Sequence, residues 1–122
     1  MDAFLRAYLE TALWSSTDEQ DQPFDANYGV DDIAEESVRN AAVDCLAFRE
    51  DNAADLASVG QGRGEWTDME GHAHDFWLTR NGHGAGFWDR GYGAVGERLT
   101  VAAHVWGPSD VYVGDDGKVY LT

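Results

Sequence analysis

Residues 72–91 constrain the fold of this chain more than any other stretch, because they combine histidines, aromatic residues and glycines in one short segment. The side chains of residues 74–79 alternate between two faces in the way that a β-strand requires. Asn81 and Gly82 form a strong turn signal, since both tolerate positive φ. We therefore expect a strand over 74–79, a turn that starts at Asn81, and a short return strand at 87–89.

The first half of the chain carries helical patterns. Apolar residues recur at helical spacing over 2–14, which predicts an amphipathic helix. Residues 15–30 are rich in polar residues and contain Pro23 and Gly29, so we expect an exposed loop there. Residues 31–58 again show helical spacing, which predicts a long helical region with a break near residues 51–52.

The rest of the chain alternates between connectors and regular elements. Residues 60–64 are mostly glycine and predict a flexible connector, whereas residues 65–69 fit either an edge strand or a turn. Residues 95–106 predict a helix that ends at the following Gly-Pro pair. Residues 110–121 predict a second hairpin, with its turn at Asp116-Gly117.

Together these elements predict one domain over residues 1–122, which is long enough to bury a modest core. A helical part occupies 1–58 and a hairpin–helix–hairpin part occupies 72–122. The fold class that we expect is α+β: an antiparallel sheet built from two hairpins, with about three helices packed on it.

Cysteine content and hydropathy indicate the compartment. Cys45 is the single cysteine, so no internal disulfide can form, which suits a reducing cytosol. The first residues lack the basic start and apolar run of a secretory signal, and no apolar run is long enough to span a bilayer. We therefore expect a cytoplasmic protein.

Residues 75–91 read DFWLTRNGHGAGFWDRG. This segment resembles the signature of a family of small, uncharacterised proteins encoded in bacteriophage genomes. Residues 110–121 and, more loosely, residues 12–19 also resemble that family. The resemblance implies a phage or prophage origin and action in the cytoplasm of the host cell. It carries over no catalytic residues, because no activity is attached to the family.

Charge is the outstanding bulk property of the sequence. The formal net charge is −15, and it is unevenly distributed: residues 1–60 hold 14 acids and 3 bases, whereas residues 61–122 hold 9 acids and 5 bases. Such a surface repels nucleic acid and anionic membranes and attracts basic proteins or cations. Two alternatives stay open: the acidity can simply keep the protein soluble, or the single lysine beside many aspartates can reflect a high-salt host or a GC-rich genome.

From this charge we predict a non-enzymatic protein that binds and inhibits a basic, DNA-binding host protein, such as a defence nuclease, by mimicking DNA. Carboxylates four residues apart on a helix, such as those of Asp32 and Glu36 or Asp51 and Asp55, rise by about 6 Å, which is on the order of the phosphate spacing along a DNA strand. We expect no cofactor, no metal, and no direct contact with nucleic acid or membrane. The predicted partner-binding residues are Asp18, Glu19, Asp21, Asp25, Asp31, Asp32, Glu35 and Glu36.

The alternative function is a small enzyme or metal-dependent binding protein centred on residues 72–91. Zinc takes three or four His, Cys or carboxylate ligands, and several such residues lie here. On a strand, however, His74 and Asp75 would point to opposite faces, which favours a structural role for the histidines. The residues of this alternative site are His72, His74, Asp75, His83, Asp89 and Arg90.

Three further patterns have structural interpretations that we favour. Residues 91–96 match the GxGxxG spacing of dinucleotide-binding loops, but no parallel βαβ unit is predicted around them, so we expect a connection into a helix. Arg80 and Arg90 can pair with local carboxylates and rigidify the segment. The remaining pattern is aromatic and fits either an exposed interaction surface or, as we prefer, the core; it comprises Trp77, Trp88 and Tyr92.

Overall fold

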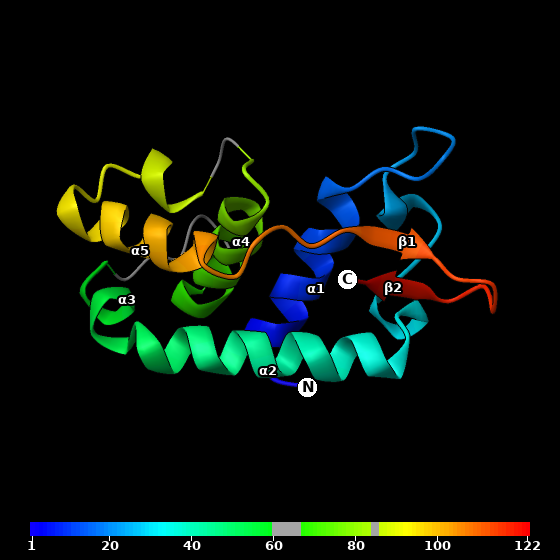
Figure 1. Ribbon diagram of the computed structural model, residues 1–122, viewed down its shortest axis with the longest axis horizontal. Coiled ribbons are helices and arrows are strands. Elements are labelled where there is room, and N and C mark those ends of the chain that lie inside the picture. The colour runs from blue at the N-terminus through cyan, green and yellow to red at the C-terminus, as the bar shows by residue number, and fades with distance from the viewer. Residues whose placement is uncertain (60–66, 84–85) are drawn as a thin grey trace.

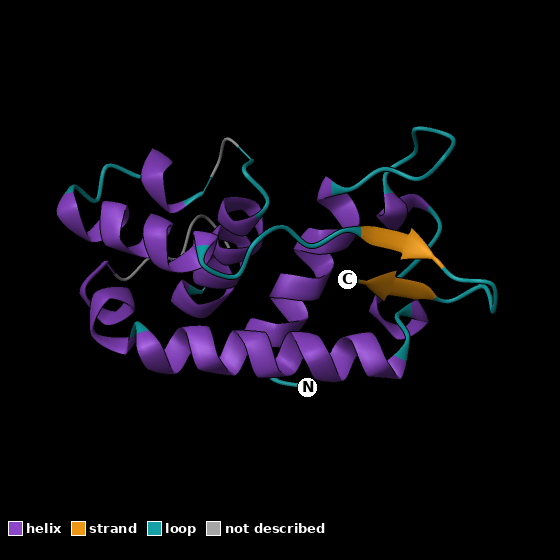
Figure 2. Cartoon of the chain, viewed as in Figure 1, coloured by secondary structure: helices purple, strands orange, loops and turns teal. Residues whose placement is uncertain are grey.

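The computed structural model describes residues 1–59, 67–83 and 86–122, and within them the chain is mainly helical (Figure 1). Figure 2 shows that the strands form one small hairpin. The α-helices are α1 (Ala3–Ser15), α2 (Glu35–Asp51), α3 (Ala53–Val59), α4 (Asp68–Arg80) and α5 (Ala94–His104). The short 3-10 helices are η1 (Phe24–Ala26), η2 (Val30–Asp32) and η3 (Phe87–Asp89), and the strands are β1 (Val111–Val113) and β2 (Val119–Leu121). Within the described residues, no helix combines the length and the apolar composition needed to cross a bilayer.

Helix α4 is the most deeply buried element. Every residue from Gly71 to Arg80 is buried, and the helix packs against α1 and α5. The ring of Phe76 in α4 stacks on Phe48 of α2, with centroids 4.0 Å apart. Tyr8 of α1 also contacts this ring, at a centroid distance of 5.5 Å. Because neighbours cover all faces of α4, the core of the protein is built around this helix.

The predicted strand at 74–79 is wrong, because these residues form the middle of α4. A capping box starts the helix: the Thr67 hydroxyl accepts from the Glu70 N–H at 3.2 Å, and the Glu70 carboxylate accepts from the Thr67 N–H at 3.1 Å. A helix that is buried on all faces has no single apolar stripe, so residues 68–80 show no helical period of apolar residues. The connector expected at 60–64 lies outside the described residues, as do residues 65–66. The edge strand or turn expected at 65–69 is wrong for the described part of that range, because Thr67 caps α4 and residues 68–69 lie in its first turn.

The expected α+β fold, with helices packed on a sheet of two hairpins, is therefore also wrong. Residues 87–89 form η3 rather than a return strand, so the first hairpin does not exist. The second hairpin is confirmed: β1 and β2 pair antiparallel, with Val111 opposite Leu121 and Val113 opposite Val119. Across the described segments, these two strands make up the whole sheet. The helices pack around α4 instead.

The other predicted helices are confirmed, except that the helical region expected from residue 31 begins at Glu35, because residues 31–32 belong to η2. Asp2 caps α1, and its carboxylate accepts a hydrogen bond from the Leu5 N–H at 2.8 Å. The predicted break near residues 51–52 separates α2 from α3, and the side chain of Asn52 donates to the Phe48 carbonyl at 2.9 Å. Helix α5 is followed by Gly107, whose φ of +70° suits glycine and ends the helical path.

Candidate functional site

The eight carboxylates predicted to bind a partner lie on neighbouring segments at one end of the molecule (Figure 1). They belong to the loop after α1, to η1, to η2 and to the first turn of α2. Residues 16–36 hold all eight and contain no lysine or arginine. Residues 110–122, which include the β1–β2 hairpin, add three carboxylates and one lysine at the same end. We refer to residues 16–36 and 110–122 together as the acidic end.

Backbone hydrogen bonds fix the segments of the acidic end relative to one another. Residues 16–24 form a loop, here called the acidic loop, at whose base the Phe24 N–H donates to the Ser16 carbonyl at 3.0 Å. Ile33 forms a parallel bridge with Val119, and the Ala34 N–H donates to the Val119 carbonyl at 2.8 Å. The hairpin is therefore tied to the segment between η2 and α2, and the carboxylates of both parts share one frame.

Few of these charges are neutralised within the protein. Glu35 lies 3.9 Å from Arg39, and in the described part of the chain it is the one member of the eight that forms an ion pair. Asp18 and Asp32 accept hydrogen bonds from backbone N–H groups of their own loops. All eight side chains except that of Asp18 belong to exposed residues, and Asp18 is half-buried. The acidic end therefore presents a largely uncompensated negative field to solvent.

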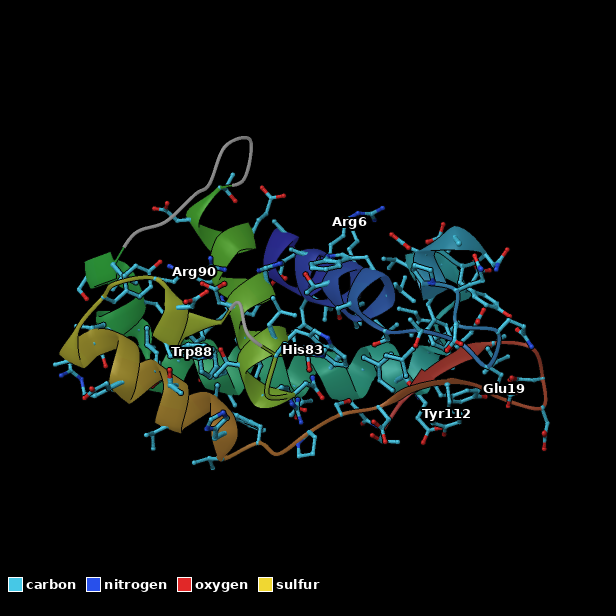
Figure 3. All side chains as sticks on the ribbon, turned by 90° about the horizontal axis from the view of Figure 1, so that it is seen from above. Arg6, Glu19, His83, Trp88, Arg90 and Tyr112 are labelled. Carbon is cyan, nitrogen blue, oxygen red and sulfur yellow. The ribbon has the colours of Figure 1, made fainter. Side chains whose placement is uncertain are left out.

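A groove of about 390 Å³ lies between the acidic loop and β1. Its walls include Asp18 and Glu19 on one side and Val111 and Tyr112 on the other. Tyr112 is 47% exposed, and Figure 3 shows it at the same end of the molecule as Glu19. A carboxylate beside an exposed aromatic face suits a lysine or arginine side chain, because the ring face attracts cations.

The aromatic wall of this groove is held by the hairpin turn. The Tyr120 hydroxyl donates to the Asp116 carboxylate at 2.7 Å. This hydrogen bond lowers the pKa of Asp116 and raises the pKa of Tyr120, since it favours the ionised acid and the protonated phenol. Tyr112 stacks on Tyr120 with ring centroids 5.6 Å apart. The ionised turn therefore orients the ring that lines the groove.

The helical spacing that suggested DNA mimicry is absent from the structure. Asp32 belongs to η2 and Glu36 to α2, while Asp51 ends α2 and Asp55 lies in α3. Because each pair spans a break between two helices, the rise of one continuous helix does not set its separation. The negative field of the acidic end depends instead on how residues 16–36 fold against the hairpin.

The alternative His/Asp site is replaced by a buried ion pair. Asp75, which is 1% exposed, accepts two hydrogen bonds from the Arg90 guanidinium, at 2.6 and 3.2 Å, and lies 3.3 Å from Nδ1 of His74. His83 and Asp89 are exposed. Among the described residues, no group of three or more His, Cys, Asp or Glu side chains is placed to hold a metal ion.

Arg80 has a structural role, as predicted, but its partners come from several parts of the chain. Its guanidinium donates to the Asp44 carboxylate at 3.1 Å, to the Tyr8 hydroxyl at 2.9 Å, and to the carbonyls of Trp106 and Gly107 at 3.1 and 2.8 Å. Burial raises the pKa of Tyr8 above its usual range, so its phenol stays protonated. This network links α4 to α1, α2 and the end of α5.

Gly86 and Thr79 pack closely against each other. The Thr79 hydroxyl accepts a hydrogen bond from the Phe87 N–H at 3.0 Å. Gly86 lies against this hydroxyl so closely that a Cβ atom there would overlap it. Residues 91–96 lead from η3 into α5, so the GxGxxG spacing lacks the preceding strand of a dinucleotide-binding loop.

The aromatic residues of this segment divide between core and surface. Trp77 is buried and donates to the Ser15 hydroxyl at 2.8 Å, as the core interpretation predicted. Trp88 is 55% exposed, contrary to that interpretation, and Tyr92 is half-buried. Cys45 is buried in α2.

Comparisons with protein families, with curated proteins and with solved structures gave no match to this chain. The candidate site therefore rests on its own geometry. Sequence reasoning identified the eight carboxylates from their charge, but it missed the groove and the contribution of Tyr112 and Tyr120. No signal in the sequence shows that residues 110–122 fold against residues 16–36.

Proposed function

We propose that this protein binds a basic, DNA-binding protein of a bacterial host through its acidic end and thereby prevents that partner from holding DNA. It acts in the host cytoplasm, in keeping with the phage-type resemblance of residues 75–91. The observation that carries the proposal is the joining of residues 16–36, with eight carboxylates and no basic residue, to a hairpin segment that adds three more.

Electrostatics make such a surface a competitor of DNA. A protein that grips DNA contacts phosphates with lysine and arginine side chains, and these contacts supply much of its affinity. The exposed carboxylates of the acidic end offer the same side chains an anionic surface, and among the described residues most of them form no ion pair that a partner would have to displace. Long-range attraction between surfaces of opposite charge also accelerates encounter, by about 10- to 1,000-fold at low salt.

The groove beside Tyr112 gives this attraction a specific contact. A lysine or arginine of the partner that enters it meets the exposed Tyr112 ring and the carboxylates of Asp18 and Glu19. A cation over an aromatic face contributes about 0.5–2 kcal/mol, depending on its desolvation. The proposal requires no catalytic step. The buried polar side chains of α4 instead stabilise the fold.

A fluorescent nona-arginine peptide provides a defined probe of the acidic end. Anisotropy titrations at 50 and 300 mM NaCl would compare the unchanged protein with a variant that carries Glu19→Gln, Asp25→Asn, Asp31→Asn and Glu36→Gln. None of these four carboxylates forms a hydrogen bond or ion pair in the described structure, so their removal should leave the fold intact. We expect the variant to bind the peptide at least about tenfold more weakly at 50 mM NaCl, and added salt to remove most of the difference.

The matched control neutralises four exposed carboxylates elsewhere, at Glu50, Asp51, Asp89 and Glu97, and so changes the net charge by the same amount. Equal loss of binding in the two variants would show that total charge matters and the acidic end does not. Host proteins captured by the unchanged protein, and lost by the acidic-end variant, would then be titrated with labelled duplex DNA. A partner that keeps its DNA when the protein is added would contradict the proposed inhibition.

A further inference from the structure

A larger cavity lies at the opposite end of α2 from the acidic end, among the C-terminal part of α2, α3 and the N-terminal parts of α1 and α4. Its volume is about 570 Å³. The described wall is mainly apolar and includes the side chains of Phe4, Leu46, Leu56 and Met69. Leu46 and Met69 are also exposed, so the apolar surface continues out of the cavity.

His72 is the buried polar residue of this wall. The residue is 7% exposed, and its Nε2 atom is closed off from solvent and has no hydrogen-bond partner in the described part of the chain. Burial lowers the pKa of His72, although Asp75 and Asp68 oppose this, so the imidazole is neutral at pH 7. A neutral imidazole offers one donor and one acceptor. A buried polar atom that lacks a partner is unfavourable, and a ligand that supplies one removes that cost.

The charged residues around the cavity limit what it can bind. Arg49 is already engaged, because its guanidinium lies 3.1 Å from the Asp2 carboxylate and 4.9 Å from the centre of the Phe4 ring. The other charged residues of the wall are the acids Glu50 and Asp68, which repel anions. A cation would lose its hydration against a mainly apolar wall, which is costly. An uncharged molecule therefore fits these surroundings best.

We propose that this cavity binds an uncharged, mainly apolar small molecule whose one polar group forms a hydrogen bond with the imidazole of His72. Sites for small molecules commonly measure about 300–1,000 Å³ and combine apolar walls with a few polar groups, as this cavity does. The ligand would also cover the exposed side chains of Leu46 and Met69. The inference does not depend on the acidic end, so either proposal can fail without the other.

Two probes of the same shape test the polar contact. Indole carries an N–H donor, whereas benzothiophene has a sulfur atom in its place and donates nothing. We would titrate each into the ¹⁵N-labelled protein and follow the backbone amide resonances. Both probes should shift the resonances of Phe4, Leu46, Leu56 and Met69 with saturation, and indole should bind about fivefold more tightly, as one hydrogen bond warrants.

Two variants test whether the tighter binding of indole depends on His72, and whether both probes bind in the cavity. His72→Phe keeps an aromatic ring without the imidazole nitrogens, and it should abolish the preference for indole while benzothiophene still binds. Ala57→Leu places a larger side chain into the wall from an exposed position of α3, and it should abolish binding of both probes. Circular dichroism would verify that each variant is folded. The proposal is refuted if neither probe shifts these resonances, or if the preference for indole persists in His72→Phe.

Discussion

Replacing Arg80 with methionine should destabilise this protein strongly, because the guanidinium joins several segments of the core. Its side chain is 5% exposed and makes four hydrogen bonds, one of them to the Asp44 carboxylate. Removing one partner of a buried ion pair costs about 3–5 kcal/mol, since the groups left behind stay desolvated. Asp44 is 31% exposed and can be rehydrated, so we expect a loss near the lower limit, about 3 kcal/mol.

The loss of stability in Arg80→Met corresponds to a shift in the melting temperature, Tm. Unfolding entropy is about 2.1 cal/mol/K per residue, so for a chain of 122 residues a loss of about 3 kcal/mol lowers Tm by roughly 12 °C. Urea unfolding followed by tryptophan fluorescence, together with thermal melts at pH 7, would measure both quantities. We expect the urea midpoint to fall, while the slope of the free energy of unfolding against urea concentration stays unchanged.

Arg98→Met is the matched control for this experiment. Arg98 also pairs with a carboxylate, that of Asp55 at 2.8 Å, but its side chain is 57% exposed. Solvent screens such a pair, so its loss should lower the urea midpoint far less. If the two methionine variants were equally stable, the idea that burial makes the Arg80 network essential would have to be abandoned. Arg80→Lys should fall between them, because an ammonium keeps the charge but not the planar set of donors.

Three other predictions follow from the buried positions. Gly86→Ala should lower the free energy of unfolding by about 1–3 kcal/mol, because its Cβ overlaps the Thr79 hydroxyl, whereas Gly29→Ala, whose nearest neighbouring atom is 4.0 Å away, should leave the urea midpoint unchanged. Burial lowers the pKa of His72 from 6.5, so the unfolded chain takes up a proton at this imidazole more readily than the folded chain does. The free energy of unfolding should therefore fall as the pH drops below about 6.5. The urea midpoints at pH 7.5 and 5.5 should differ less in His72→Phe than in the unchanged protein. Burial, followed by the nearby carboxylates, raises the pKa of Cys45 above its usual range, so Ellman's reagent should react with this thiol only as fast as the protein unfolds, and rapid labelling of the native protein would contradict this.

The helices that the sequence predicted correctly have one exposed and one buried face. Helix α1 has such a stripe, with Phe4, Leu5, Tyr8 and Leu9 buried while Arg6 and Glu10 form an exposed pair. The β1–β2 hairpin was recognisable from its Asp-Gly turn, and the ends of α2 and α5 from the residues that follow them. Helix α4 gave no such signal, because its polar residues are as deeply buried as its apolar ones.

For the candidate site, the sequence predicts features that lie within one segment but not those that form between distant segments. Charge counting along the sequence located the carboxylates of residues 16–36, since a run of acids without a base is visible in one dimension. The groove is different, because it forms between that run and β1, some 80 residues further along the chain. The bridge from Ile33 to Val119 and the hydrogen bond from the Ala34 N–H to the Val119 carbonyl hold these segments together, and no local sequence pattern predicts them.

The buried polar side chains of α4 hold separate segments of the chain against the core. Each one binds a different segment: Asp75 binds Arg90 after η3, Trp77 binds Ser15 at the end of α1, and Arg80 reaches Asp44 in α2. A single substitution there loosens the attachment of a whole segment, because a buried donor or acceptor loses its partner. The carboxylates of residues 16–36 carry few such bonds, so individual changes among them alter the surface charge and spare the core. The part of the chain that is most restricted by packing is therefore separate from the part that we propose to meet the partner.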